Sequence, residues 1–199
     1  FTSDNGSNGR NGGSNAPLAG RKGSTMEGGM RVPMVVRLPG VIPAGTVCSE
    51  LTTTMDLLPT LASFSEGKLP DHQIDGRDIS SLLRGESGAR SPHEVFYYYR
   101  RRQLQAIRWG NWKWHLPLES TFPRWNDATF KTKGRGGKLI DLETDLKEQF
   151  DVSSNHPQVM AKMRAFAKDA SHDLGNEAEA GSGQRQALTL DHSVPMILP

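Results

Sequence analysis

Glycine is concentrated near the N-terminal end of this 199-residue chain, and that concentration limits what the segment can form. Eight glycines fall within residues 6–29, and no regular spacing of apolar residues accompanies them. Glycine weakens helices and strands because it loses more conformational freedom on folding than any other residue. We therefore expect a long loop over residues 6–30. Loops longer than about 15 residues in compact domains are usually functional or disordered.

The composition excludes several classes of protein. Hydrophobic residues make up 35% of the chain and charged residues 23%, so the chain is neither a membrane protein nor fully disordered. No window approaches the roughly 20 consecutive apolar residues that a membrane-spanning helix needs, so no transmembrane segment is expected. The net charge of +2 gives little attraction for polyanions, and we expect no nucleic-acid partner.

The single cysteine limits which disulfides, metal sites and nucleophiles the chain can contain. Cys48 is the only cysteine, which excludes an intramolecular disulfide and a zinc site built on cysteines. The neighbouring residues 46–51 include no histidine that could activate the thiol as a nucleophile. We therefore expect an ordinary buried thiol at this position.

Two apolar segments in the first half predict regular structure. Residues 31–40 form a short apolar run bounded by prolines and a glycine, which suits a strand in a buried sheet. Residues 57–64 place apolar side chains on one helical face. Asp56 is the expected N-cap of that helix, and Pro59 falls in its first turn, where proline is tolerated.

The second half has the pattern of a small antiparallel sheet. Residues 95–99, 104–109 and 112–116 are three short runs rich in β-forming residues. The pair Gly110-Asn111 separates the last two runs and is a tight-turn signal. Residues 137–142 could add a fourth strand.

A helix is expected after the sheet. Residues 157–174 carry an apolar stripe at helical spacing, with Pro157 at the first helical position and Asn155 or His156 as the cap. Residues 176–199 are rich in Gly, Glu, Gln and Ser without any period, which predicts a flexible tail.

Asp4 and Asn5 place a carboxylate and an amide carbonyl side by side before Gly6. Both are hard oxygen ligands, which suits Ca²⁺ or Mg²⁺ rather than zinc or copper. Two ligands do not complete a site, so further oxygens would have to come from elsewhere. Asp-Asn-Gly is also a favoured turn sequence, and a plain turn is the alternative.

Lys22 lies between Gly20 and Gly23, where the backbone can approach a ligand closely and an ammonium group can hold an oxyanion. Ser24 and Glu27 have the spacing of a capping box, so a short helix is expected to start there. The N-terminus of that helix would also favour an anion. A solvated basic loop is the alternative.

The role of His115 and of the four tryptophans stays open at this level. His115 lies at a strand end with no partner visible in the sequence, so a structural role is the alternative to a catalytic one. Trp109, Trp112, Trp114 and Trp125 could stack on sugar rings or belong to the core.

Four motifs occur together in a fixed order along the chain. They are Phe1–Gly6, Gly20–Pro33, Met55–Leu61 followed by Asp75–Ile79, and Leu139–Glu148. This ordered set resembles the C-terminal part of a type I, formylglycine-dependent sulfatase of the arylsulfatase kind, within the alkaline-phosphatase-like superfamily. The resemblance extends to about Leu174 and covers most of the chain.

The resemblance implies roles for individual residues. Asp4 and Asn5 would be two ligands of a Ca²⁺ ion that also holds the sulfate, with Mg²⁺ as the second choice. Lys22 would contact a sulfate or leaving-group oxygen and offset negative charge in the transition state. In some relatives a histidine near the position of His115 lines the substrate pocket. The substrate would be a sulfated small molecule or a sulfated carbohydrate.

The resemblance also implies an α/β fold in two parts. Residues 1–92 would form the C-terminal end of the catalytic domain, and residues 93–175 would form a small antiparallel sheet with a packed helix. Residues 176–199 would be the flexible tail. Members of the family are often secreted, periplasmic or lysosomal.

The sequence departs from the family pattern at the nucleophile. The family makes formylglycine from Cys or Ser in a Cys/Ser-x-Pro/Ala-x-Arg motif, and no such motif occurs in the 199 residues. That motif and the paired aspartates of the calcium site lie N-terminal in the family, so we expect a C-terminal fragment of a longer protein. A phosphodiesterase or phosphonate hydrolase of the same superfamily is one alternative. A non-catalytic carbohydrate-binding fragment is another.

We expect the purified 199-residue chain to release no sulfate from an aryl sulfate ester, because it carries no formylglycine motif. The measurement is a chromogenic sulfatase assay in the presence of Ca²⁺. Measurable sulfate release by the chain alone would contradict this expectation.

Overall fold

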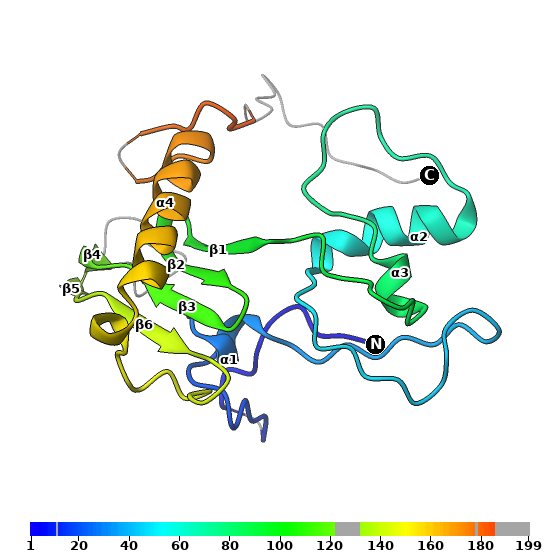
Figure 1. Ribbon diagram of the computed structural model, residues 1–199, viewed down its shortest axis with the longest axis horizontal. Helices are drawn as coiled ribbons and strands as arrows, with labels where there is room; N and C mark the ends of the chain where they lie inside the picture. The colour runs from blue at the N-terminus through cyan, green and yellow to red at the C-terminus, as the bar shows by residue number, and fades with distance from the viewer. Residues whose placement is uncertain (11, 122–131, 178, 186–199) are drawn as a thin grey trace, which may run out of the picture.

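The computed structural model describes residues 1–10, 12–121, 132–177 and 179–185. Figure 1 shows a sheet with one long helix against it, and, at the far side of the molecule, a second group of two shorter helices. Long irregular segments connect the two groups. None of the helices in the described ranges is long and apolar enough to cross a membrane.

Four strands form one antiparallel sheet in the order β1-β2-β3-β6. They are β1 (Val95–Arg100), β2 (Gln103–Trp109), β3 (Trp112–His115) and β6 (Lys138–Asp141). Trp109 pairs with Trp112, so Gly110-Asn111 closes a two-residue hairpin. The predicted hairpin and the predicted fourth strand are both confirmed. Two further strands, β4 (Leu118–Thr121) and β5 (Thr132–Arg135), pair with each other in a separate sheet that the sequence pattern did not predict.

The long helix α4 (Pro157–Asp173) packs on one face of this sheet, as predicted (Figure 1). Pro157 is its first residue, and no side chain caps its N-terminus. The buried core between helix and sheet consists of Leu104, Ile107, Trp114, Leu139, Met160, Met163 and Ala170. Trp114 is therefore a core residue, whereas Trp125 lies outside the described residues.

The remaining helices are short. They are α1 (Glu27–Met30), α2 (Leu57–Ser65) and α3 (Ser80–Leu83), with 3-10 turns at Thr54–Asp56 and Ser153–Asn155. The capping box expected at Ser24 does not form, because α1 begins three residues later, with Met26 at its N-cap position. Asp56 does precede α2, but its carboxylate does not cap that helix.

The strand predicted over residues 31–40 is not observed. Met34 forms an isolated bridge with Thr2, and the Val35 N–H donates to the Phe1 carbonyl oxygen at 2.8 Å. Val35 is 63% exposed. A strand needs a partner along its length, and among the described residues the backbone hydrogen bonds from residues 32–40 to another segment join only Val35 to Phe1. Its two prolines remove further amide donors.

The thiol of Cys48 is exposed, so the prediction of a buried cysteine is wrong. It lies in an irregular segment between Gly40 and the first 3-10 turn. The preceding Val47 is 93% exposed, so its side chain packs on no core element of the described residues.

Replacing Met163 with Ala should lower the free energy of unfolding by about 2–5 kcal/mol, because Met163 is fully buried between α4 and the sheet. Urea unfolding followed by tryptophan fluorescence measures the change, since all four tryptophans lie within residues 109–125. Arg164→Ala, which removes the exposed neighbouring side chain, is the control and should change stability by less than about 0.5 kcal/mol. Equal effects of the two substitutions would refute this packing.

Candidate functional site

The residues predicted to bind the metal ion and the sulfate lie on the surface. Asp4 and Lys22 are exposed, and Asn5 is half-buried. The amide N–H of Lys22 donates to the carbonyl oxygen of Ser7 at 3.0 Å. The structure thus brings Lys22 to the chain segment that directly follows Asp4 and Asn5.

The glycine-rich loop between them is closed by the side chain of Asn15. Its carbonyl oxygen accepts the N–H of Ser7 at 2.7 Å, and its amide donates to the carbonyl oxygens of Ser7 at 2.8 Å and Gly20 at 3.2 Å. One amide side chain therefore joins the beginning and the end of the loop. Its interactions hold the base of the loop that carries Lys22.

Two glycines let the backbones pack directly on each other at this base. The Gly6 N–H donates to the Gly29 carbonyl oxygen at 3.1 Å, and a Cβ added to Gly6 would lie 1.8 Å from the Gly28 carbonyl oxygen. A Cβ added to Gly28 would lie 2.6 Å from the Ala19 carbonyl oxygen. No side chain fits at either position, so glycine at residues 6 and 28 has a steric cause.

The donor chemistry of Asp4 and Asn5 fits a hard cation. Asp4 offers an exposed carboxylate, whose nearest hydrogen-bond donor is the Ser3 hydroxyl at 3.5 Å, and Asn5 offers an amide oxygen. Within the described ranges, no group of three His, Cys, Asp or Glu side chains is arranged to hold a metal ion. Asp4 and Asn5 would therefore supply only part of a coordination shell.

A buried network of charges lies behind the loop and starts at Glu27, the first residue of α1. The Glu27 carboxylate accepts hydrogen bonds from Lys113 Nζ at 2.9 Å, Arg108 Nη1 at 2.9 Å and the Tyr98 hydroxyl at 2.8 Å. The side chains of Glu27 and Lys113 are both fully buried. These donors come from three strands of the sheet, so the pair joins α1 to the sheet.

Glu148 completes the network from the segment after β6. One carboxylate oxygen accepts the N–H of Glu27 at 2.7 Å, which satisfies the first amide of α1. The other lies 3.1 Å from Lys113 Nζ and 2.5 Å from His115 Nε2. The network is therefore neutral overall, because its two carboxylates are matched by the ammonium group of Lys113 and the guanidinium group of Arg108.

The pKa values follow from this arrangement. Burial raises the pKa of Glu27, but Lys113 and Arg108 outweigh burial and hold that pKa below its usual value. Burial likewise raises the pKa of Glu148, and the hydrogen bond from His115 together with Lys113 reverses the shift. Burial lowers the pKa of His115, with Lys113 acting in the same direction. Both carboxylates are therefore ionised at neutral pH, and the imidazole is neutral.

His115 is a member of this network. It is 5% exposed, and its Nε2 carries the hydrogen because a carboxylate can only accept. Its Nδ1 has no hydrogen-bond partner in the described part of the chain. The geometry favours the structural role left open above, and contact of His115 with substrate stays a prediction.

The sequence pattern did not predict this network, because its members lie far apart along the chain. Lys113 and Glu27 are 86 residues apart, and Glu27 and Glu148 are 121 residues apart. An alternating strand such as Trp112-Lys113-Trp114-His115 is typical of a sheet with one solvent-exposed face. Both faces are covered instead, since alternate side chains point to α4 and to α1.

A third carboxylate, that of Asp56, is also buried, which the sequence pattern did not predict. Asp56 is fully buried and accepts the N–H of Arg77 at 2.8 Å and that of Thr53 at 2.7 Å. His93 Nε2 lies 2.7 Å from the same carboxylate. Asp56 thus connects three segments around α2 instead of capping the helix.

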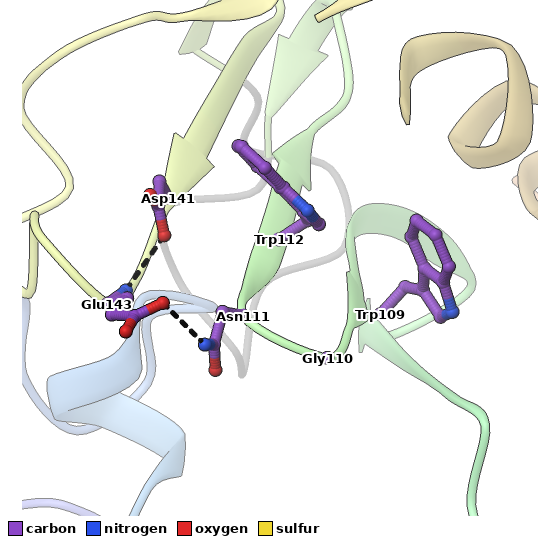
Figure 2. Close-up of a pocket in the computed structure, with 6 residues that line it drawn as sticks. All are labelled: Trp109, Gly110, Asn111, Trp112, Asp141 and Glu143. Atoms are coloured by element: carbon purple, nitrogen blue, oxygen red, sulfur yellow. Dashed lines mark hydrogen bonds between the residues drawn. The ribbon is translucent and has the colours of Figure 1, made fainter. Parts of the chain in front are cut away.

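Trp109 and Trp112 flank the hairpin turn, beside an open hollow of about 380 Å³ (Figure 2). Its other lining residues are Gly110, Asn111, Asp141 and Glu143. Lys162 Nζ lies 4.3 Å from the centre of the Trp109 ring, and the Trp112 ring contacts His156 with ring centres 4.5 Å apart. Both rings therefore already contact other side chains, from α4 and from the residue before it.

Comparison with known proteins supports the family resemblance that the ordered motifs indicate. A model of the sulfatase family matches residues 1–66, and a model described as the C-terminal region of aryl-sulfatase matches residues 91–190. The chain belongs to the sulfatase family. The first match contains Asp4, Asn5 and Lys22, and the second contains the sheet and α4.

Individual sulfatases are similar to parts of the chain. Steryl-sulfatase of Mus musculus is 45% identical over 120 residues, which cover 56% of this chain and 19% of the relative. Arylsulfatase A of Bos taurus is 40% identical over 173 residues, which cover 80% and 34%. The crystal structure of PsFucS1 sulfatase from Pseudoalteromonas sp. matches with a TM-score of 0.71 and 30% identity, over 91% of this chain and 38% of that one. The chain thus spans well under half of each of these sulfatases, and the fold matches that of a solved sulfatase.

We expect stability to fall as the pH is lowered below about 6.5, the usual pKa of histidine. Because the pKa of His115 is lower in the folded chain, the unfolded chain binds a proton in this range that the folded chain does not. The contribution of neutral His115 is therefore complete above pH 6.5 and is lost as the pH falls through its folded pKa. Glu27 and Glu148, whose folded pKa values lie below 4.5, add a second loss at lower pH.

Urea unfolding at a series of pH values measures this profile, and His115→Gln should flatten it between about pH 7 and 5. His172→Gln, which removes an exposed imidazole from α4, is the control and should keep the parent profile. An unchanged slope in His115→Gln would show that the imidazole is not held neutral by the network.

Proposed function

We propose that this chain supplies one wall of the active site of a sulfuric ester hydrolase. The observation that carries the proposal is the closure of the glycine-rich loop onto Ser7, which puts Lys22 beside the segment of Asp4 and Asn5. Membership of the sulfatase family supports it, because both family models match and the first includes all three residues.

Each of the three residues has a role in this proposal. Asp4 and Asn5 would hold a Ca²⁺ ion together with ligands from elsewhere. When bound, the ion supplies positive charge that draws electrons from the sulfate oxygens. The ammonium group of Lys22 would bind a sulfate or leaving-group oxygen and offset the charge that develops as the ester bond breaks. Because Lys22 is exposed, its side chain can reach a substrate without any rearrangement of the core.

The nucleophile is assigned to residues outside these 199. No Cys/Ser-x-Pro/Ala-x-Arg motif occurs in the sequence, and the chain covers only 19–38% of the three sulfatases compared above. The complete site would then combine a formylglycine from another part of a longer protein with Asp4, Asn5 and Lys22. Its substrate would be a sulfated small molecule or a sulfated carbohydrate.

Sequencing the coding region on the 5′ side of the Phe1 codon tests this first. An in-frame formylglycine motif supports the proposal, and a start codon directly before Phe1 contradicts it.

In the protein translated from the complete reading frame, Lys22→Ala should lower kcat for a sulfate ester by about 10²–10³-fold. The fold should not change, because the Lys22 side chain is exposed. Steady-state kinetics with matched sulfate and phosphate esters provide the measurement. Lys68→Ala, which removes another exposed lysine, is the control and should keep the parent kcat. Full activity of Lys22→Ala would reject the role of Lys22, and preferred hydrolysis of the phosphate ester would reject the sulfatase assignment.

A further inference from the structure

A second hollow lies beside the glycine-rich loop. It has a volume of about 600 Å³ and is open to solvent. Residues 8–10 and 13–21 form one wall, and Lys147 and Gln149 form the other. The hollow therefore lies between the loop that carries Lys22 and the segment that carries Glu148.

The charge of this hollow is entirely positive. Arg10, Arg21 and Lys147 line it, and no Asp or Glu does. All three side chains are exposed, and none forms an ion pair with a carboxylate in the described ranges. The three cations are therefore available to a ligand. The hollow also differs from the buried network, in which each cation has a carboxylate partner.

Backbone hydrogen bonds hold the two walls together. The Ala19 N–H donates to the Leu146 carbonyl oxygen at 3.2 Å, which links the loop to the opposite wall next to Lys147. The Leu18 N–H donates to the Asn15 carbonyl oxygen at 2.8 Å, and this turn forms part of the lining. The hollow is thus a site with two connected walls.

The outward direction of Lys147 and Gln149 follows from the residue between them. Glu148 has a positive φ of 52°, and its side chain points inward to Glu27 and His115. Asp145 fixes the same turn, because its carboxylate accepts the N–H of Gln149 at 2.7 Å. With Glu148 directed into the core, its two neighbours face the hollow.

We propose that this basic hollow, lined by Arg10, Arg21 and Lys147, binds a second sulfate group of a multiply sulfated saccharide whose first sulfate lies at Lys22. The inference rests on the proposed function, because it places the scissile sulfate at Lys22. Arg21 and Lys22 are consecutive residues, with Cα atoms about 3.8 Å apart, so one saccharide can reach both places.

The chemistry of the lining favours a sulfated saccharide over other anions. Guanidinium groups bind planar pairs of oxyanion oxygens through two parallel hydrogen bonds, and two of the three cations are arginines. Asn8, Ser14 and Gln149 add amide and hydroxyl groups that can bind sugar hydroxyls. The described lining contains no aromatic ring on which a nucleobase could stack, which disfavours single-stranded nucleic acid.

Calorimetric titration of the 199-residue chain tests the hollow without any catalytic step. The probes are a trisulfated disaccharide, its monosulfated and unsulfated counterparts, and a short single-stranded oligonucleotide. We expect the trisulfated disaccharide to bind most tightly. The double variant Arg10→Ala/Lys147→Ala should weaken that binding by roughly tenfold. Arg164→Ala/Lys168→Ala, which removes two exposed cations from α4, is the matched control and should keep the parent affinity.

Three outcomes would overturn the proposal. They are equal weakening by the two double variants, equal affinity for the monosulfated and trisulfated probes, and tighter binding of the oligonucleotide.

A second experiment, on the complete enzyme, separates failure of this proposal from failure of the proposed function. In the complete enzyme the hollow variant should raise KM only for the trisulfated substrate, whereas Lys22→Ala should lower kcat for both sulfated substrates. If Lys22→Ala leaves kcat unchanged while the hollow variant still raises KM, the role of Lys22 is rejected. If the hollow variant leaves KM unchanged while Lys22→Ala still lowers kcat, sulfate binding in the hollow is rejected.

Discussion

The ion pair between Glu27 and Lys113 fixes the candidate site to the rest of the molecule. Helix α1 has only four residues, too few to be stable alone, so its position depends on what it contacts. Its carboxylate is bound by three strands, and its first amide is bound by Glu148. Removing one partner of a buried pair typically costs about 3–5 kcal/mol, because the other charge stays buried without compensation. The loop that ends in α1 therefore takes its position from the sheet.

The elements that the sequence predicted well are those with local signals. Gly110-Asn111 between two apolar runs marked the hairpin, and Pro157 before an apolar stripe marked the start of α4. Residues 31–40 show where such signals fail. An apolar run predicts burial in a sheet, but a strand also needs a neighbour, and no local pattern states whether one is present. Exposure of Cys48 has the same origin, because it depends on what the rest of the chain places nearby.

The residues of the candidate site also fall into two groups, those that a local sequence signal predicts and those that only the fold brings together. The order of short motifs identified Asp4, Asn5 and Lys22, since each of them stands inside a recognisable local sequence. The partner of His115 is 33 residues away and that of Lys113 is 86 residues away, so no spacing rule connects them. Only the fold shows that one face of β3 contacts the helix and the other contacts the loop.

The contact between Gly6 and Gly28 has a consequence for how relatives of this protein can diverge. At this contact backbone lies against backbone, so there is no side chain whose replacement could adjust it gradually. Residues 8–10, 13–14 and 16–18 lie between the fixed ends of the loop and line part of the open hollow. Their composition can therefore change over evolution while Asn15 holds the base of the loop and Lys22 keeps its place. New ligand preferences can arise in this segment without loss of the geometry at its base.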